Sequence, residues 1–222
     1  MLTDAKAERQ GGPVPIARKI SRDERQMQLI RATMRVLARK GYASTMISDV
    51  ASEAGVSHGL VIFHFETKEK LLTATLLHMA EEYRSNWVTA LEKSGPAPEE
   101  QLNALIEADF DKKICTPEHL ACWCAFWGEA QSRPIYQQEC APNDKKYIRN
   151  LERVCAELIA QGNYGHDATR AARIIRLVSD GLWLDILSMK NPYNRMEALR
   201  TIFTCAAVLF PKHFTVDGLI RR

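Results

Sequence analysis

The stretch from residue 45 to residue 70 constrains the fold most, with the sequence T-M-I-S-D-V-A-S-E-A-G-V-S-H-G-L-V-I-F-H-F-E-T-K-E-K. Thr45 can cap a short helix whose apolar residues recur at helical spacing up to Gly55, where a left-handed stop is expected. Ser57 can cap a second short helix over residues 58–65. We therefore predict two short helices joined by a tight turn, as in a helix-turn-helix; any helical hairpin is the alternative.

Gly59 favours DNA binding over a plain hairpin. Glycine inside so short a helix costs about 1 kcal/mol relative to alanine, so a role other than helix stability is expected. In a helix-turn-helix the second helix enters the major groove, and a residue without a side chain lets that helix lie close to DNA.

The pattern A-G-V-S-x-G-x-x-x-x-H-F-x-x-K-E-x-L-L, from Ala54 to Leu72, resembles the DNA-binding motif of the TetR family of one-component repressors. It implies an all-α, TetR-like fold and an operator DNA partner. We expect base or sugar contacts from Ser57, His58, Leu60 and Ile62, close approach at Gly59, and phosphate contacts from Thr45, His64 and Lys68.

Four regions are predicted along the chain. Residues 1–20, with two glycines and two prolines, form a flexible arm, and residues 21–66 form a three-helix DNA-binding domain. Its first helix starts after Ser21, a capping box with Glu24, and ends at Gly41. Residues 67–213 form a helical ligand-binding and dimerisation domain, and residues 214–222 form a tail.

Helical patterns fill the second domain, and no strand pattern is present. The first helix is capped by Thr67 and is long and amphipathic; it links the two domains. Further helices are expected over residues 102–114, 118–132, 142–162, 168–189 and 194–210. The last two are apolar on more than one face, which predicts burial against a second copy in a homodimer, with burial inside a monomer core as the alternative.

The composition of the chain limits the classes of function that it can have. Residues 1–70 hold 12 Lys and Arg against 8 Asp and Glu, whereas residues 71–222 hold 18 against 19. This excess fits a module that faces phosphates, although ordinary solvated surfaces also carry such charge. The chain has no long apolar run and no leader pattern, so we expect a cytoplasmic protein without a membrane partner. We find no catalytic motif and no paired cysteine motif for a metal, and expect neither an enzyme nor a cofactor.

A second group of residues suits a small cation. Trp123 and Trp127 lie one turn apart, and Phe126 is three residues from Trp123. Aromatic residues at this spacing usually belong to a core, but carboxylates are nearby in the sequence, and tryptophan faces attract quaternary ammonium ions. The candidate ligand-binding residues are Asp109, Phe110, Asp111, Trp123, Phe126, Trp127 and Trp183.

Five short motifs resemble the regulatory domain of BetI-type TetR repressors. They are F-D at 110–111, W-C-A-F-W at 123–127, P-I-Y at 134–136, the R-N-L that ends at Leu151, and D-G-L-W-L at 180–184. The resemblance implies a choline-responsive repressor of genes for choline uptake and glycine betaine synthesis. The chain departs from the family at Asp185, where a basic residue is usual, and at Ile62, where a small polar residue is usual. A multidrug-type sensor of lipophilic cations is the alternative, because an aromatic pocket with acidic residues also suits such ligands.

Overall fold

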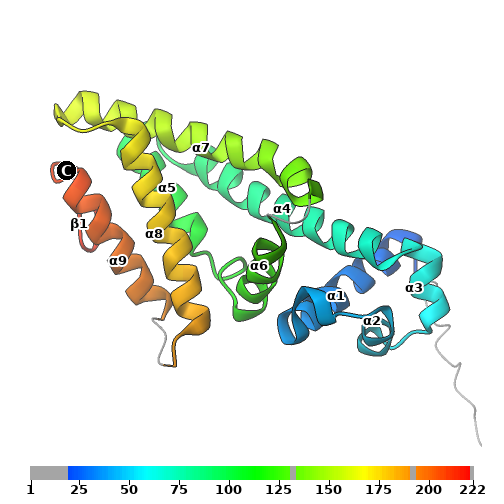
Figure 1. The fold of residues 1–222 in the computed structure, drawn as a ribbon. Coiled ribbons are helices and arrows are strands. Elements are labelled where there is room, and N and C mark those ends of the chain that lie inside the picture. Colours follow the sequence, from blue (N-terminus) through cyan, green and yellow to red (C-terminus); the bar gives the residue numbers. More distant parts are fainter. Residues whose placement is uncertain (1–19, 131–133, 191–193, 221–222) are drawn as a thin grey trace, which may run out of the picture.

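The computed structural model describes residues 20–130, 134–190 and 194–220. In this part the chain forms helices α1 to α9 and one two-stranded hairpin (Figure 1). The helices are α1 Arg22–Ser44, α2 Ile47–Ala54, α3 His58–Phe65, α4 Lys68–Lys93, α5 Pro98–Asp109, α6 Pro117–Ala130, α7 Pro134–Gly162, α8 Ala168–Ser188 and α9 Arg195–Leu209. The predicted all-α class is confirmed.

The N-terminal unit consists of α1, α2 and α3. At its start the Ser21 hydroxyl accepts the Glu24 N–H at 3.1 Å, and the Glu24 carboxylate accepts the Ser21 N–H at 2.8 Å, so the predicted capping box is confirmed. Gly41 takes a positive φ of 75° and interrupts the helical backbone of α1. Glycine adopts this conformation without steric cost, and the chain can therefore turn there towards α2.

The prediction that Thr45 caps α2 was wrong, because the N-cap is Met46. The Thr45 side chain is only 1% exposed, and its hydroxyl donates to the Gly41 carbonyl at 2.7 Å. The turn after Gly41 directs Thr45 back onto α1, and the cap falls one residue later. Asp49 partly replaces a side-chain cap by accepting the Met46 N–H at 3.2 Å.

The turn and the second short helix agree with the sequence prediction. Gly55 is left-handed with φ 66°, and the Ser57 hydroxyl accepts the Leu60 N–H at 3.3 Å. Val61 and Phe65, one turn apart, are buried in the core of the unit. Helix α3 therefore has one inward face, and its other residues remain on the outside.

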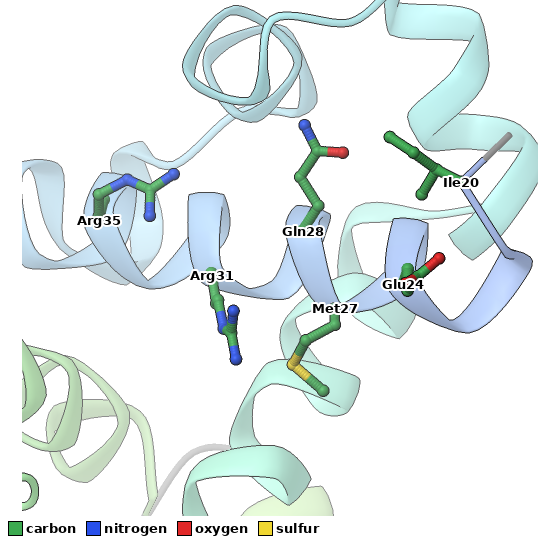
Figure 2. A pocket seen from close by; sticks show the side chains of 6 residues that line it. All are labelled: Ile20, Glu24, Met27, Gln28, Arg31 and Arg35. Carbon is green, nitrogen blue, oxygen red and sulfur yellow. The ribbon is translucent and has the colours of Figure 1, made fainter. Parts of the chain in front are cut away.

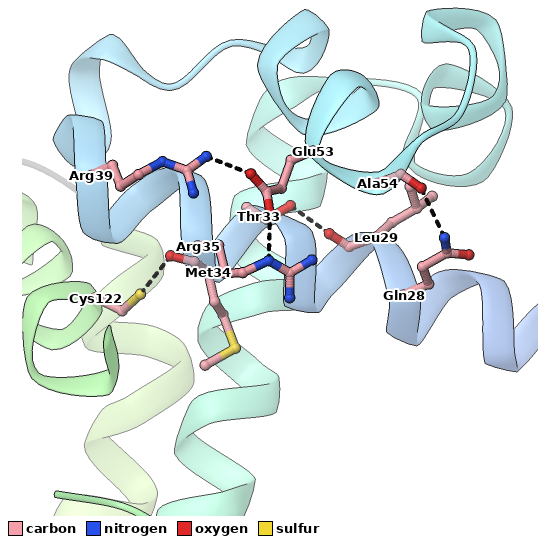
Figure 3. Close-up of polar contacts among 9 residues, drawn as sticks. All are labelled: Gln28, Leu29, Thr33, Met34, Arg35, Arg39, Glu53, Ala54 and Cys122. Carbon is pink, nitrogen blue, oxygen red and sulfur yellow. Dashed lines mark hydrogen bonds and ion pairs between the residues drawn. The ribbon is translucent and has the colours of Figure 1, made fainter. Parts of the chain in front are cut away.

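Ion pairs hold α2 against α1 (Figure 3). The Glu53 carboxylate accepts Arg35 Nε at 2.6 Å and Arg39 Nη2 at 2.5 Å. These two hydrogen bonds lower the pKa of Glu53, which stays charged at neutral pH. At the neighbouring residue, the last of α2, Gln28 Nε2 donates to the Ala54 carbonyl at 2.9 Å. The orientation of α2, and with it of α3, is thus fixed relative to α1.

Helix α4 runs from the N-terminal unit into the rest of the molecule (Figure 1). Its predicted N-cap is confirmed, since the Thr67 hydroxyl accepts the Lys70 N–H at 3.2 Å. Helix α4 packs against α5 and α7, α7 packs against α8, and α8 packs against α9. Helix α6 lies in the middle, in contact with α7, α8 and α1.

Two helices have boundaries that differ from the sequence prediction. Helix α5 spans Pro98–Asp109 rather than residues 102–114, because Pro98 starts the helix and the chain turns after Asp109. Proline suits the first turn, where its missing N–H has no helical partner. Helix α7 begins at Pro134 rather than at Pro142, which lies inside it. Helices α8 and α9 agree with the predicted ranges to within one residue at each end.

The predicted tail is corrected over its described part. Residues Phe214–Thr215 (β1) and Gly218–Leu219 (β2) form an antiparallel hairpin that packs against α9. Phe214 is 2% exposed, and its ring stacks on Phe203 with centroids 6.4 Å apart. This burial makes the segment part of the domain. No helix among the described residues is long and apolar enough to cross a membrane.

Candidate DNA-binding surface and ligand cage

The outward face of α3 contains most of the residues predicted to contact DNA. Ser57, His58 and Gly59 are exposed at its N-terminal end, and Leu60 and Ile62 are half-buried on its flanks. A Cβ atom at Gly59 would meet no other atom within 4 Å, so packing inside the protein does not require glycine there. The space outside Gly59 is open, as the approach of another molecule requires.

Lys68 and His64 lie beside this face. The Lys68 ammonium donates to the Ala43 carbonyl at 3.1 Å, which leaves donors of this three-donor group for a phosphate. Burial, with the nearby charges of Arg22 and Arg25, lowers the pKa of His64. This shift favours the neutral imidazole, which can act as a hydrogen-bonding group. The buried Thr45 hydroxyl is not presented to a phosphate in this structure.

Sequence reasoning missed two exposed apolar residues on the DNA-binding unit. Phe63 is 71% exposed on α3, and Met46 is 56% exposed before α2. A signal for Phe63 was present, since it lies between the core residues Val61 and Phe65 and must point away from both.

An open groove of about 610 Å³ follows the outside of α1 (Figure 2). Met27 and Arg31 leave α1 on the side opposite to Gln28. All of its lining residues come from the segment that forms α1 or directly precedes it: Ile20, Glu24, Met27, Gln28, Arg31 and Arg35. A groove lined by one helix does not enclose a small molecule, so we do not assign the ligand site here.

A small cavity of about 50 Å³ lies among α4, α6, α7 and α8. Its lining combines aromatic rings with charged groups. The residues are Tyr83, Trp123, Trp127, Asp144, Tyr147, Arg176, Asp180 and Trp183, and we call this set the cage.

The cage rings take two orientations. Trp127 stacks with Trp123 at 6.2 Å and with Trp183 at 6.2 Å, with interplanar angles of 28° and 11°. Tyr83 meets Trp123 and Trp183 nearly at right angles, at 6.3 Å and 5.9 Å. Rings at right angles form walls on different sides of one small space, an arrangement that suits a compact cation.

Two carboxylates and one guanidinium complete the cage. Arg176 Nε lies 3.7 Å from Asp180 Oδ2. Burial raises the pKa of Asp144 and of Asp180, and the Arg176 charge partly offsets this in both. If both carboxylates are ionised, the charged residues that line the cage carry one negative charge in excess.

Asp109 lies directly behind the cage. Its Oδ1 accepts the Tyr83 hydroxyl at 2.9 Å, and its Oδ2 accepts the Tyr147 hydroxyl at 3.0 Å. Trp183 Nε1 donates to the Asp109 backbone carbonyl at 3.0 Å. Burial raises the pKa of Asp109 to about 6, against the opposing effect of the two tyrosine hydrogen bonds. Asp109 thus fixes three aromatic side chains of the cage.

The predicted ligand-binding residues separate into two groups. The structure brings Trp123, Trp127 and Trp183 into one cage, with Asp109 behind it. Phe110, Asp111 and Phe126 do not line the cage. Phe110, the residue directly after α5, is fully buried. The Asp111 Oδ1 atom accepts the Lys113 N–H at 2.8 Å.

Sequence reasoning missed the tyrosines, Asp144 and Arg176 of the cage. In the sequence, Tyr83 and Tyr147 belong to the apolar faces of amphipathic helices, which indicates a place in the core rather than in a binding site. Asp180 was noted only as a neighbour of Trp183 in the D-G-L-W-L motif. Asp144 carried no signal, because it lies outside every motif.

Helix α6 joins the cage to the DNA-binding unit. Trp123 and Trp127 face the cage, whereas Cys122 Sγ donates to the Met34 carbonyl of α1 at 3.1 Å (Figure 3). Phe126 contacts Tyr42 edge to face at 5.8 Å. The sequence had suggested α4 as the connection, and the structure adds α6 as a second one.

The family comparisons agree with both parts of this architecture. Residues 29–75 match the family described as bacterial regulatory proteins, tetR family. Residues 98–211, which include most of the cage, match BetI-type transcriptional repressor, C-terminal. The chain belongs to the TetR family of transcriptional regulators. Within it, the regulatory domain is of the BetI type.

Relatives and solved structures extend this result. The HTH-type transcriptional regulator BetI of Paraburkholderia xenovorans is 31% identical over 183 residues, which cover 81% of this chain and 90% of that protein. A transcriptional regulator of Pseudomonas aeruginosa has a TM-score of 0.74 at 25% identity and covers 87% of this chain and 93% of that one.

A TetR-like fold also occurs in a transcriptional regulator of Saccharomonospora viridis, solved in complex with choline. It has a TM-score of 0.72 at 21% identity, with 90% of this chain and 100% of that one covered. The relatives of this TetR-family protein are regulators rather than enzymes, as the sequence predicted.

Proposed function

We propose that this TetR-family protein is a repressor whose affinity for operator DNA is controlled by a small quaternary ammonium ligand, choline or a close analogue, bound in the cage. The observation that carries the proposal is the combination of Tyr83, three tryptophans and two half-buried carboxylates around one small cavity.

The physical chemistry of the ligand matches that of the cage. Methyl groups cover the charge of a quaternary ammonium, so it donates no strong hydrogen bond and is attracted mainly to aromatic faces. One desolvated contact of this kind contributes about 2 kcal/mol, and two or three give millimolar to micromolar affinity. Asp144 and Asp180 add Coulomb attraction from two sides.

The cavity size favours a small cation over the larger ligands of a multidrug sensor. Pockets for drug-sized molecules hold about 300–1,000 Å³. The cage encloses about 50 Å³, and aromatic rings make up much of its lining. A bulky lipophilic cation would have to separate α6 from α8, whereas a trimethylammonium group requires much less movement.

The family resemblance supports a proposal for the target genes. Curated relatives that match 81% of this chain carry the name BetI, and a regulator with a similar fold was solved in complex with choline. On this basis we assign the regulated genes to choline uptake and glycine betaine synthesis. Two copies of the chain, each with one helix-turn-helix, would bind a palindromic operator.

We assign the DNA contacts to residues on or beside the exposed face of α3. Ser57, His58, Leu60 and Ile62 contact base edges or sugars, and His64 and Lys68 contact phosphates. Gly59 allows the close approach, since no atom of the protein occupies the space beside it.

The proposal is tested by calorimetry on wild type, Trp127→Ala and Phe126→Leu. The ligands are choline, glycine betaine and the neutral carbon isostere of choline. We expect choline to bind wild type and the isostere to bind much more weakly. Trp127→Ala removes one ring and should weaken choline binding about 30-fold.

Phe126→Leu is the matched control, since this residue lies on the same helix but contacts Tyr42 rather than the cage. It should leave the affinity for choline unchanged. Equal binding of choline and the neutral isostere to wild type, or unchanged choline binding by Trp127→Ala, would contradict the proposal.

A further inference from the structure

Helix α3 lacks the side chains that usually distinguish bases by paired hydrogen bonds. Specific contacts in the major groove commonly use Arg or Lys on guanine, Asn or Gln on adenine, and Asp or Glu on cytosine. None of these six residue types occurs between residues 57 and 65. The polar side chains that this segment offers are Ser57 and the two histidines.

Three large apolar side chains take their place on the outside of α3. Phe63 is 71% exposed, and Leu60 and Ile62 are partly exposed on either side of it. The inner face is already occupied by Val61 and Phe65, so these three side chains have no core to enter. The His64 ring meets Phe63 edge to face at 5.3 Å and supports its position.

Only one apolar group is displayed by the base edges of the major groove, the C5-methyl of thymine. An apolar helix surface inserted into that groove therefore gains from thymine and from no other base. The same surface would desolvate the donors and acceptors of guanine or cytosine without replacing their hydrogen bonds.

We propose that α3 recognises its operator chiefly through thymine methyl groups, with Leu60, Ile62 and Phe63 as the contacting side chains. This inference rests on α3 being the helix that enters the major groove, and it assigns the chemistry of recognition there. Each half-site then contains thymines whose methyl groups determine affinity, while His58 and Ser57 supply single hydrogen bonds.

The test removes methyl groups from the DNA and nothing else. A duplex that binds wild type is first selected from a random library at fixed salt. Each thymine is then replaced by deoxyuridine, which keeps every hydrogen-bonding group of the base. At a contacted position we expect the dissociation constant to rise about fourfold for one half-site and about fifteenfold for both.

The residues are assigned with Leu60→Ala, Ile62→Ala and Phe63→Ala on the same set of duplexes. Sensitivity to deoxyuridine at a given position should disappear in the variant that lost the contact, while the salt dependence stays as in wild type, because a methyl group carries no charge. The melting temperature of each variant reports whether it is folded.

The outcomes separate the two proposals. If no duplex is selected from the library, operator binding itself is wrong. If a duplex is selected and wild type tolerates deoxyuridine at every position, thymine recognition is overturned and operator binding stands. Sensitivity that persists at every position in all three variants overturns the assignment to these residues.

Discussion

Asp109 shows how burial gives one residue a property that its type does not have in water. The carboxylate is 3% exposed, between the hydroxyls of Tyr83 and Tyr147. Because burial disfavours the charged form, the pKa rises from 3.8 to about 6. The folded protein therefore binds this proton more tightly than the unfolded chain does.

The stability of the protein should depend on this proton. The raised pKa gives a stabilising contribution that is complete below about pH 4 and is lost as the pH rises through about 6. We compare wild type with Asp109→Asn, which cannot titrate. The free energy of unfolding of wild type, relative to that of the variant, should fall by about 2 kcal/mol between about pH 4.5 and about pH 7.

Denaturant unfolding at the two pH values measures this difference. Asp23→Asn removes an exposed carboxylate outside the core and is the control. A relative stability of wild type and Asp109→Asn that does not change with pH would show that Asp109 ionises normally.

Helix α3 shows the same dependence of a residue's surroundings on the fold. Phe63 and Phe65 are the same residue type two positions apart, yet one is 71% and the other 8% exposed. Their difference comes from helix geometry, since only positions one turn from Val61 point inward.

At the level of single elements, helix starts depend on the chain around them. Ser21, Ser57 and Thr67 cap their helices as their types predict. Thr45 does not cap α2, because the positive φ of Gly41 brings it back onto α1. Pro142 marks no helix start, because α7 extends past it to Pro134.

Helix α2 should be easy to stabilise at its N-cap. Met46 offers no side-chain acceptor there and is 56% exposed, so replacing it costs little packing. Met46→Ser supplies an oxygen for the free N–H groups of the first turn, and we expect the free energy of unfolding to rise by about 1 kcal/mol. Thermal or denaturant unfolding measures the change.

Met46→Ala is the matched control for this prediction. It removes the same side chain without adding an acceptor, and should give no gain. Equal stability of the Ser and Ala variants would mean that the first turn of α2 gains nothing from a side-chain cap.

At the level of the whole molecule, α8 leaves an apolar stripe uncovered in the single chain. Ile174, Leu177 and Leu184 are 44%, 61% and 47% exposed, and their spacing places them on one face. Helix α9 adds Val208 at 76% exposure. The sequence predicted a dimer from the double apolar character of these helices, and this exposed stripe is the surface we assign to it.

We expect wild type to sediment as a dimer at micromolar concentration. Leu177→Glu with Leu184→Glu places two charges in the interface and should give a monomer that binds a palindromic operator much more weakly, because one helix-turn-helix contacts only a half-site. Leu77→Glu changes a residue of similar exposure on α4 and should stay dimeric. A monomeric wild type would contradict the assignment of this stripe to a dimer interface.

The sequence alone determined much of the secondary structure of this protein and some of its candidate site residues. Helix periodicity, caps and the left-handed Gly55 depend on residues within about one turn of each other, so the helix-turn-helix and the order of helices could be predicted. The tryptophans at 123, 127 and 183 could be selected as candidates because aromatic residues with nearby acids indicate a cation site.

The tertiary structure alone decided which residues share the cage. Tyr83 and Asp109 are 26 residues apart, Tyr147 and Asp109 are 38 apart, and Trp183 reaches Asp109 across 74. Contacts over such separations depend on how whole helices pack, which local patterns do not specify. For the same reason the sequence could not predict that Asp144 lines the cage, that Phe126 contacts Tyr42 of α1, or that α6 connects the cage to the DNA-binding unit.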